Sequence, residues 1–385
     1  MKETIRKEFL DLTGQEPVIV RSPGRINLIG EHTDYNNGFV LPAAINKEVY
    51  FAIRKRDDKH CHIIANDLNQ DFLFDLDTNF QSSSVHWQNY FLGILDQLMK
   101  RSPPLSSGFD LIFTSNVPIG AGLSSSAAIE CGFGTALNEV FQLGLSKKDI
   151  ALIGQKAEHE FVGVNCGIMD QYACMFGVQD KTFRLDCRSL EHVLQDVNLG
   201  DYEIVLIDSK VEHSLASTEY NLRKQECEEA VQFLAKSQPN IQSLRDVTLG
   251  MLMDSKEDLD PIVFKRSLFV INENQRVFDS CSALDNNNIL DFGKLLFESH
   301  KGLSEDYEVS CDETDLLVDL AKENEDVIGS RMMGGGFGGC TINLVKRSNR
   351  DNAVASILSN YQKKTGIIAE HYFIKLADGC SVVSL

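Results

Sequence analysis

A segment rich in glycine and serine stands directly before a stretch with helical apolar spacing. In "GAGLSSSA", Gly120 and Gly122 allow backbone amides to come close to a ligand. The free amides and the positive dipole end of a following helix bind anions, and phosphate is the best candidate. The segment lacks the lysine of a Walker A loop, so that nucleotide loop is excluded. A turn capped by Ser124 or Ser125 is the alternative that this segment alone leaves open.

Carboxylates are concentrated in "RSPGRINLIGEHTDYNNGFVLPAAI", together with Arg25 and His32. The carboxylates of Glu31 and Asp34 suit sugar recognition, because each accepts hydrogen bonds from hydroxyl groups. The alternative to a sugar site is a solvent-exposed turn that carries these two carboxylates. In "VNCGIMDQYACMFG", Asp170 stands among apolar neighbours, where a carboxylate needs a partner unless it merely caps a helix.

A third segment, "MMGGGFGGCTINLV", formally matches GxGxxG at Gly334, Gly336 and Gly339. A dinucleotide site requires a strand before the glycines and a helix after them. Here "CTINLVK" after the glycines has strand character, so we exclude a dinucleotide-binding site. Two interpretations of the segment stay open: a loop whose main chain approaches a ligand, or a tight bend.

The elements that would position these segments mix strands and helices. The apolar spacing predicts a helix over 126–141, and "LSKKDIALIGQKAEHEFVGV" opens with a capping box at Ser146 and Asp149. Helices are also predicted for "MKETIRKEFLDLTG" and "STEYNLRKQECEEAVQFLAK". Strand character appears at residues 48–56, 71–78, 108–115, 202–210, 340–346 and 370–378.

Composition and charge restrict the partners. The chain of 385 residues has 37 basic and 56 acidic residues, a net charge of −19. Nucleic acid and anionic membranes need a basic surface, so we expect neither as a partner. No apolar run approaches the length of a membrane span, and ten cysteines without a CxxC pair suit a reducing compartment. We therefore expect a cytoplasmic protein. We also expect it to be a monomer.

The three segments, in this order, resemble the three signatures of the GHMP small-molecule kinases. "GRINLIGEHTDYNNGFVLPAAI", with its EHTDY, resembles the galactokinase branch, whereas "PIGAGLSSSAAIE" and "MMGGGFGGC" identify only the superfamily. The resemblance spans about residues 18 to 376. The non-catalytic sugar sensors of the family are disfavoured by the intact GLSSSAA and by Asp170.

The resemblance implies an α+β fold of two domains. The N-terminal domain would resemble domain 2 of ribosomal protein S5, and the C-terminal domain would be ferredoxin-like, with the active site in the cleft. We place the boundary near residue 195, which gives domains of 1–195 and 196–385.

The implied activity is ATP-dependent phosphorylation of α-D-galactose at its C1 hydroxyl, giving α-D-galactose 1-phosphate and ADP in the Leloir pathway. Mg²⁺ would be the cofactor. A kinase for N-acetylgalactosamine or another sugar is one alternative, and a regulator that binds ATP and galactose without turnover is another.

The resemblance also implies roles by position. Asp170 and Arg25 would act at the reacting hydroxyl, with Arg25 keeping Asp170 ionised. Ser126 and Glu158 would hold Mg²⁺. The ATP phosphates would contact Gly120, Ala121, Gly122, Leu123, Ser124, Ser125 and Ser126. The sugar would contact Glu31, His32, Thr33, Asp34, Asp170 and Tyr220. Trp87 is the candidate for adenine contact, with a core position as the alternative.

Overall fold

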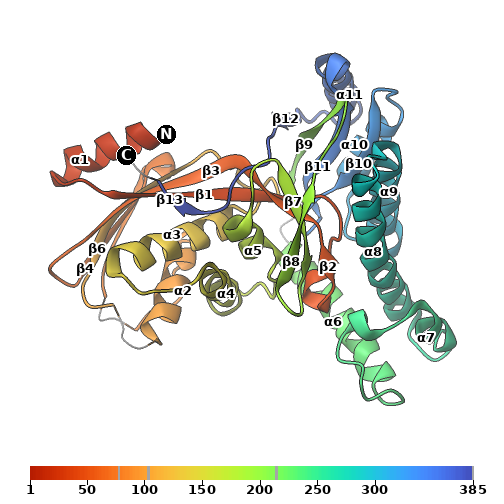
Figure 1. Ribbon diagram of the computed structural model, residues 1–385, viewed down its shortest axis with the longest axis horizontal. Helices are drawn as coiled ribbons and strands as arrows, with labels where there is room; N and C mark the ends of the chain where they lie inside the picture. Colours follow the sequence, from red (N-terminus) through yellow and green to blue (C-terminus); the bar gives the residue numbers. More distant parts are fainter. Residues whose placement is uncertain (77–78, 102–104, 213–215, 384–385) are drawn as a thin grey trace.

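The computed structural model describes residues 1–76, 79–101, 105–212 and 216–383. Figure 1 shows two parts side by side, one built mainly from the first half of the chain and the other from the second half. Each part combines helices with a β-sheet, in agreement with the predicted α+β class.

The N-terminal part is built on a six-stranded sheet with the strand order β13-β1-β3-β6-β4-β5. Neighbouring strands are antiparallel, except that β4 and β6 are parallel. The strands are β1 (Val18–Asn27), β3 (Pro42–Lys55), β4 (His60–Ala65), β5 (Gln70–Asp75), β6 (Phe109–Ser115) and β13 (Ser381–Val382). Because β13 pairs with β1, the end of the chain returns to the first sheet.

Helices cover both faces of this sheet because its strands direct apolar side chains to both sides. Ile19 and Ala52 pack against α1 (Lys2–Thr13) on one face. Val20 and Phe51 belong to the main core, which includes the helices of the opposite face. These helices are α2 (Gln88–Met99), α3 (Ser125–Phe141), α4 (Lys147–Ala157) and α5 (Met169–Phe176). A small antiparallel sheet of β2 (Phe39–Val40), β7 (Lys181–Asp186) and β8 (Glu191–Asp196) completes this part.

The C-terminal part contains a four-stranded antiparallel sheet with the order β10-β11-β9-β12. Along the chain its elements follow the pattern β-α-β-β-α-β, with the first and third strands adjacent at the centre, which is the ferredoxin-like arrangement. Val205 of β9 packs there in one core cluster with Leu317 and Tyr361. The elements are β9 (Tyr202–Glu212), α10 (Asp312–Lys322), β10 (Val327–Met332), β11 (Gly338–Lys346), α11 (Arg350–Thr365) and β12 (Glu370–Phe373).

Among the described residues, four further α-helices lie between β9 and α10. They are α6 (Ala216–Leu234), α7 (Leu249–Asp254), α8 (Pro261–Asp285) and α9 (Ile289–Lys301). Figure 1 shows α8 and α9 along the outer edge of the C-terminal part. Short helical turns are η1 (Asp34–Asn36), η2 (Asn66–Leu68), η3 (Glu158–Val162), η4 (Leu244–Asp246), η5 (Gly302–Asp306) and η6 (Arg347–Asn349).

Most of the predicted elements are confirmed. The helix predicted over 126–141 is α3, and the capping box of Ser146 and Asp149 forms at the start of α4 with both of its hydrogen bonds. The strand predicted over 370–378 is shorter, because β12 ends at Phe373. The patterns missed β1, whose Pro23 and Gly24 read as strand breakers but lie at a bulge.

Two further expectations concern the glycine segment and membranes. The strand β11 begins at Gly338, so a strand and not a helix follows the glycines, as predicted. Among the described residues, no helix has the length and apolarity needed to cross a membrane. The domain boundary near residue 195 stays a prediction.

Candidate active site

A cavity of about 320 Å³ lies where the two parts of the molecule meet. It is lined by predicted site residues from seven different elements or loops. They are Arg25, Glu31, His32, Asp34, Ser126, Glu158, Asp170 and Tyr220. Gly334, Gly335 and Gly336, in the loop between β10 and β11, close it from the C-terminal part.

Arg25 and Asp170 form a two-bond ion pair on the wall of the cavity. The Nε of Arg25 donates to Oδ1 of Asp170 at 2.7 Å, and Nη2 donates to Oδ2 at 2.9 Å. Arg25 lies on β1 and Asp170 in the first turn of α5. This planar fork fixes the orientation of the carboxylate.

Ser124 completes this cluster. It precedes α3 with a left-handed backbone, φ +55°, and its hydroxyl donates to Oδ2 of Asp170 at 2.5 Å. Its side chain makes no hydrogen bond to the first turn of α3. The prediction was that Ser124 or Ser125 caps the helix through its side chain, and it is wrong for Ser124, because the backbone turns this hydroxyl toward Asp170.

The loop before α3 is held against β1. The amide of Arg25 donates to the carbonyl of Leu123 at 3.2 Å, and its Nη1 donates to the carbonyl of Gly122 at 2.6 Å. A Cβ at Gly24 would lie only 2.8 Å from the Leu123 carbonyl oxygen, so this approach requires glycine. The first and second motifs are thus in direct contact.

The third motif touches the other two. A Cβ on Gly334 would lie 3.3 Å from the carbonyl oxygen of Gly122, and one on Gly335 would lie 3.3 Å from the ring of Tyr220. The amide of Gly334 donates to Oε1 of Glu31 at 2.9 Å. The three motifs and α6 therefore converge on one site.

A buried arginine, Arg331, ties Glu31 to the end of β10. Its side chain is fully buried, and Nη2 lies 3.1 Å from Oε1 of Glu31. Its Nε donates to the carbonyl of Leu28 at 2.9 Å, and Nη1 donates to that of Met332 at 2.7 Å. Sequence analysis missed Arg331, although a lone charge in the apolar run "VIGSRMMGG" was a signal.

Asp34 is buried beside the cavity. Its Oδ1 accepts from the amide of Tyr35 at 2.9 Å. Burial raises the pKa of Asp34 to about 7, and the charge of Asp170 adds to this, while the amides of Tyr35 and Met169 oppose it. Near neutral pH this carboxyl can therefore donate to a hydroxyl as well as accept from one.

Ser126 and Glu158 both line the cavity. Burial raises the pKa of Glu158 to about 7, the nearby Ser126 hydroxyl opposes this rise, and the charge of Asp170 adds to it. No cationic side chain in the described part of the chain pairs with Glu158. Two oxygen donors that lack a cation fit Mg²⁺, which prefers oxygen ligands.

A second acidic group, Glu130, lies behind the site on α3 and is fully buried. The amide nitrogen of Gln171 donates to its Oε2 at 3.0 Å. Burial raises the pKa of Glu130 well above its usual value, and the charges of Glu158 and Asp170 add to this. Sequence analysis missed it, although a lone acid in the apolar stripe "AAIECGFG" was a signal.

Some predicted residues lie outside the cavity lining. Thr33 is fully buried, and its hydroxyl oxygen lies 2.8 Å and 2.6 Å from the carbonyl oxygens of Gly30 and Phe39, which share its one hydrogen. It thus holds the turn that carries His32 and Asp34. The lining also does not include Gly120, Ala121, Gly122, Leu123, Ser124 and Ser125.

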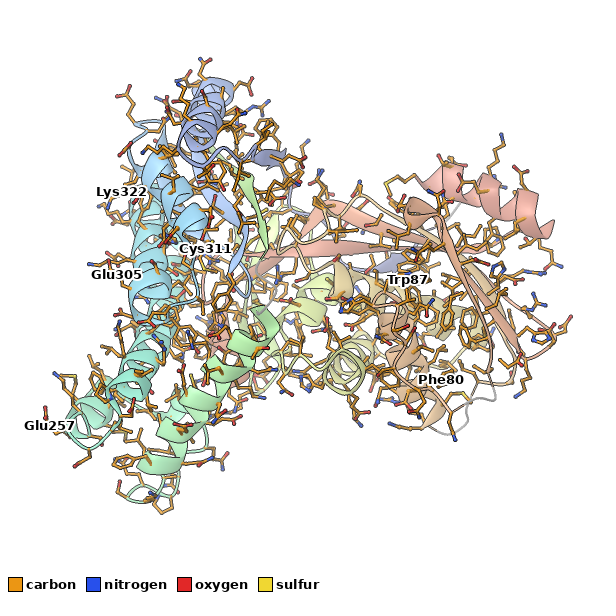
Figure 2. All side chains as sticks on the ribbon, turned by 180° about the vertical axis from the view of Figure 1, so that it is seen from behind. Phe80, Trp87, Glu257, Glu305, Cys311 and Lys322 are labelled. Atoms are coloured by element: carbon orange, nitrogen blue, oxygen red, sulfur yellow. The ribbon has the colours of Figure 1, made fainter. Side chains whose placement is uncertain are left out.

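Trp87 packs in the N-terminal core and does not line the cavity (Figure 2). Its indole N–H donates to Gln70 at 2.7 Å. Its ring contacts those of Phe72, Phe91 and Phe113. Trp87 is partly buried against this core, and its contact with adenine stays a prediction.

Three family profiles match the chain in the predicted order. The galactokinase galactose-binding signature matches residues 7–55, the GHMP kinases N terminal domain residues 89–178, and the GHMP kinases C terminal domain residues 281–364. A galactokinase from Glaesserella parasuis is 41% identical over 390 residues, which cover 100% of this chain and 99% of the relative. The chain belongs to the galactokinase family. A galactokinase from Thermosipho africanus is 42% identical over 368 residues, covering 94% and 99% of the two chains.

Solved structures agree with membership in the galactokinase family. The crystal structure of Lactococcus lactis galactokinase complexed with galactose matches with a TM-score of 0.95 and 34% identity, covering 99% of this chain and 100% of that one. Mevalonate kinase from Methanococcus jannaschii has a TM-score of 0.65 at 18% identity over 94% and 99% of the chains, and shares the fold. The predicted family, the two-part GHMP fold and the assignment as a kinase are confirmed.

Proposed function

We propose that this chain transfers the γ-phosphoryl group of ATP to the C1 hydroxyl of α-D-galactose, giving α-D-galactose 1-phosphate and ADP in galactose metabolism. One observation carries the proposal. The carboxylate of Asp170 is held by Arg25 and Ser124 on the wall of a cavity that the galactose-binding signature also lines.

Asp170 has room to receive one more hydrogen bond. An ionised carboxylate offers about four acceptor positions. Arg25 uses two of them and Ser124 a third, and Oδ1 accepts only from Arg25 among the described residues. The side chain of Asp170 is 27% exposed, so a substrate hydroxyl can reach it. Asp170 would orient the C1 hydroxyl and accept its proton.

Arg25 would supply positive charge beside the reacting oxygen. Phosphoryl transfer depends on alignment and charge neutralisation, because negative charge is spread over the transferring group. The guanidinium of Arg25 is buried and fixed by Asp170 and by the carbonyl of Gly122, so it would act without reorganisation.

The phosphates of ATP would lie along residues 120–126. Gly120 and Gly122 have left-handed φ values, +74° and +73°, and the side chain of Ser124 leaves the first-turn amides of α3 without a cap. These amides and the dipole of α3 favour an anion.

Mg²⁺ would be held by Ser126 and Glu158 together with phosphate oxygens. Bound Mg²⁺ would neutralise charge on the phosphates. The described residues contain no group of three or more His, Cys, Asp or Glu side chains able to hold a metal. One carboxylate plus phosphates is a usual ligand set for Mg²⁺, so this finding agrees with the assignment.

The sugar would contact Glu31, His32, Asp34 and Tyr220 in addition to Asp170, with Thr33 supporting their turn. The first four line the cavity around Asp170 and combine acceptors with donors. A sugar presents hydroxyl groups in fixed directions, so such a set would distinguish one epimer from another.

A coupled assay of ADP release over a panel of sugars tests this function. We expect turnover with galactose that requires ATP and Mg²⁺. Faster turnover of N-acetylgalactosamine than of galactose would show that N-acetylgalactosamine is the preferred substrate. Binding of ATP and galactose without ADP release would identify a regulator.

We further propose that the enzyme works as a monomer in the cytoplasm. All ten cysteines are free thiols, which suits a reducing compartment. Light scattering of the purified protein tests the monomer, and fractionation of the source cells tests the compartment.

A further inference from the structure

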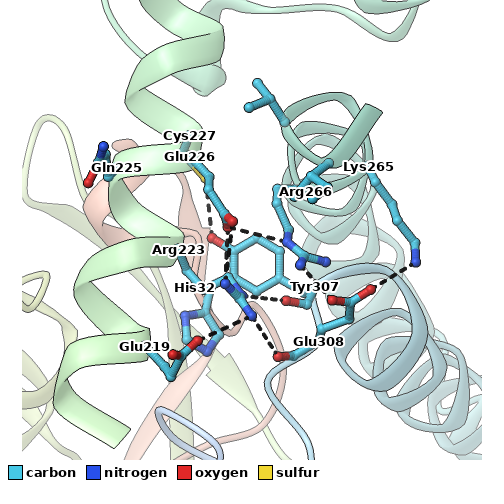
Figure 3. A network of polar contacts seen from close by, with 12 residues as sticks. His32, Glu219, Arg223, Gln225, Glu226, Cys227, Lys265, Arg266, Tyr307 and Glu308 are labelled. Carbon is cyan, nitrogen blue, oxygen red and sulfur yellow. Dashed lines mark hydrogen bonds and ion pairs between the residues drawn. The ribbon is translucent and has the colours of Figure 1, made fainter. Parts of the chain in front are cut away.

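A row of four polar side chains leads from His32 away from the cavity. Nδ1 of His32 lies 2.8 Å from the hydroxyl of Tyr35, which lies 2.7 Å from the hydroxyl of Tyr307. The Tyr307 hydroxyl lies 3.2 Å from Sγ of Cys227 on α6. Figure 3 shows Tyr307 between Cys227 and His32. His32, Tyr307 and Cys227 are all buried.

His32 carries a single ring proton at neutral pH. Burial, together with the positive charge of Arg223, lowers the pKa of His32 to about 3. The proton therefore sits on either Nδ1 or Nε2, and hydrogen bonds to the ring decide which nitrogen holds it.

Counting hydrogens separates the two possibilities. Three links join four groups, and each hydroxyl or thiol has one hydrogen to donate. If Nδ1 is unprotonated, Cys227 donates to Tyr307, Tyr307 to Tyr35, and Tyr35 to Nδ1. Every hydroxyl and thiol hydrogen of the row then takes part in a hydrogen bond. If Nδ1 is protonated, both hydroxyls point the other way and the thiol hydrogen finds no acceptor within the row.

The surroundings of both ends favour the first possibility. Nε2 of His32 is buried without a hydrogen-bond partner among the described residues, and the ring lines the cavity, so a proton on Nε2 is left for a ligand there. At the far end, the Tyr307 hydroxyl lies 3.2 Å from the Cys227 sulfur, so the thiol hydrogen has an acceptor when the thiol is the donor of this bond.

We infer that the row from Cys227 through Tyr307 and Tyr35 fixes His32 as the tautomer with its proton on Nε2. Tyr35 contacts the imidazole, whereas Tyr307 and Cys227 are positioning residues that act through it. His32 thus presents a donor to the cavity. Resting on the proposed function, the group that it recognises is an oxygen of the sugar.

The positions of the row are set by the C-terminal part. Nε of Arg223 donates to the carbonyl of Tyr307 at 2.7 Å, and Nη2 donates to that of Glu308 at 3.1 Å (Figure 3). The rings of His32 and Tyr307 lie 4.9 Å apart between centroids. Residues of α6 and of the segment after α9 thereby determine the chemistry of a side chain in the N-terminal part.

Nitrogen NMR of histidine-labelled, substrate-free protein tests the inference, with His32→Asn identifying the His32 signals. We expect Nδ1 to show the shift of an unprotonated nitrogen and Nε2 that of a protonated one. The opposite assignment, or an imidazolium at neutral pH, overturns the inference. This wild-type spectrum decides the tautomer even if a variant does not fold.

Variants then test the row. Tyr35→Phe removes the donor to Nδ1 and should give averaged shifts from mixed tautomers, with a smaller change for Tyr307→Phe. Cys227→Ser keeps a donor and should retain the wild-type shifts. Tyr361→Phe is the matched control, because Tyr361 is equally buried and its hydroxyl donates to Ser209 at 2.9 Å, remote from His32. Unchanged His32 shifts in both Tyr35→Phe and Tyr307→Phe overturn the inference.

Kinetics with galactose provide an independent readout. Tyr35→Phe should raise KM for galactose about threefold to tenfold with kcat little changed, the effect of weakening one hydrogen bond. The spectrum is recorded without substrate. A failure of galactose turnover would therefore contradict the proposed function and leave the tautomer result standing.

Discussion

Arg25 and Asp170 are 145 residues apart in the chain, yet Arg25 donates to Asp170 through Nε at 2.7 Å and through Nη2 at 2.9 Å. The side chain of Arg25 is 4% exposed. A buried cation in this position needs its partner, and the partner is oriented by the fork. The pair therefore joins β1 to α5 and prepares one carboxylate for a substrate hydroxyl.

Asp170→Asn should lower kcat by roughly 10² to 10⁴ while ATP affinity is largely retained, because a positioned proton acceptor is lost. Steady-state kinetics and calorimetric titration with ATP measure the two effects. Asp110→Asn is a matched control, since Asp110 is also a buried carboxylate paired with arginines, Arg54 and Arg56, but lies outside the cavity. Near-normal kcat in Asp170→Asn would remove Asp170 from the reaction.

Arg25→Ala should lower kcat by about 10² to 10³, because preorganised charge at the reacting group is lost. Arg25→Lys should recover part of this loss, because lysine restores charge but cannot make two parallel bonds to Asp170 while bonding Gly122. Kinetics of both variants at saturating substrates provide the measurement. Equal rates for Arg25→Lys and wild type would show that the fork is unimportant.

Glu158→Gln should weaken the Mg²⁺ dependence of the rate and lower kcat, because an amide oxygen is a poorer ligand than a carboxylate. Titration of activity with Mg²⁺ at fixed ATP tests this. Glu160→Gln is the control, since Glu160 lies in the same turn but pairs with Lys100 at the surface. The same titration curve for Glu158→Gln and wild type would exclude Glu158 from the metal site.

Glu130→Gln should stabilise the protein at alkaline pH. Burial raises the folded-state pKa of Glu130, so its neutral form is favoured in the fold. The stabilisation by that proton is complete below the unfolded pKa, about 4.3, and is lost as pH rises toward the folded pKa, by up to about 1.4 kcal/mol per pH unit. Glutamine imitates the neutral acid, and its amide can donate to Oε1 of Gln171, which has no partner among the described residues.

Thermal unfolding between pH 5.5 and 8.5 measures this effect. The advantage of Glu130→Gln over wild type should grow with pH. Glu139→Gln, an exposed glutamate on the same helix, should show no such trend. A pH-independent difference for Glu130→Gln would mean that Glu130 does not take up a proton on folding.

Glucose should be a very poor substrate, with kcat/KM lower than for galactose by a factor of roughly 10⁴, because a misdirected hydroxyl leaves buried groups such as Asp34 unpaired. The coupled assay measures both sugars under one set of conditions. Comparable values for glucose and galactose would contradict the choice of sugar while leaving kinase activity intact.

The sequence alone could reveal those features that depend on residues lying close together in the chain. Three motifs in order identified the family, and with it the fold class and eight of the residues that line the cavity. The helix at 126–141 and the capping box of Ser146 and Asp149 were predictable because their interactions lie within a few residues.

Only the tertiary structure decided how these groups are paired. Ser124 or Ser125 was expected to cap α3, but a left-handed backbone turns the Ser124 hydroxyl to Asp170, and residue type does not encode that rotation. Arg331 reaches Glu31 across 300 residues, and Tyr307 reaches Tyr35 across 272. Such partners become neighbours only when the two parts pack together, because buried charges and hydroxyls take whichever partner the fold brings within hydrogen-bonding distance.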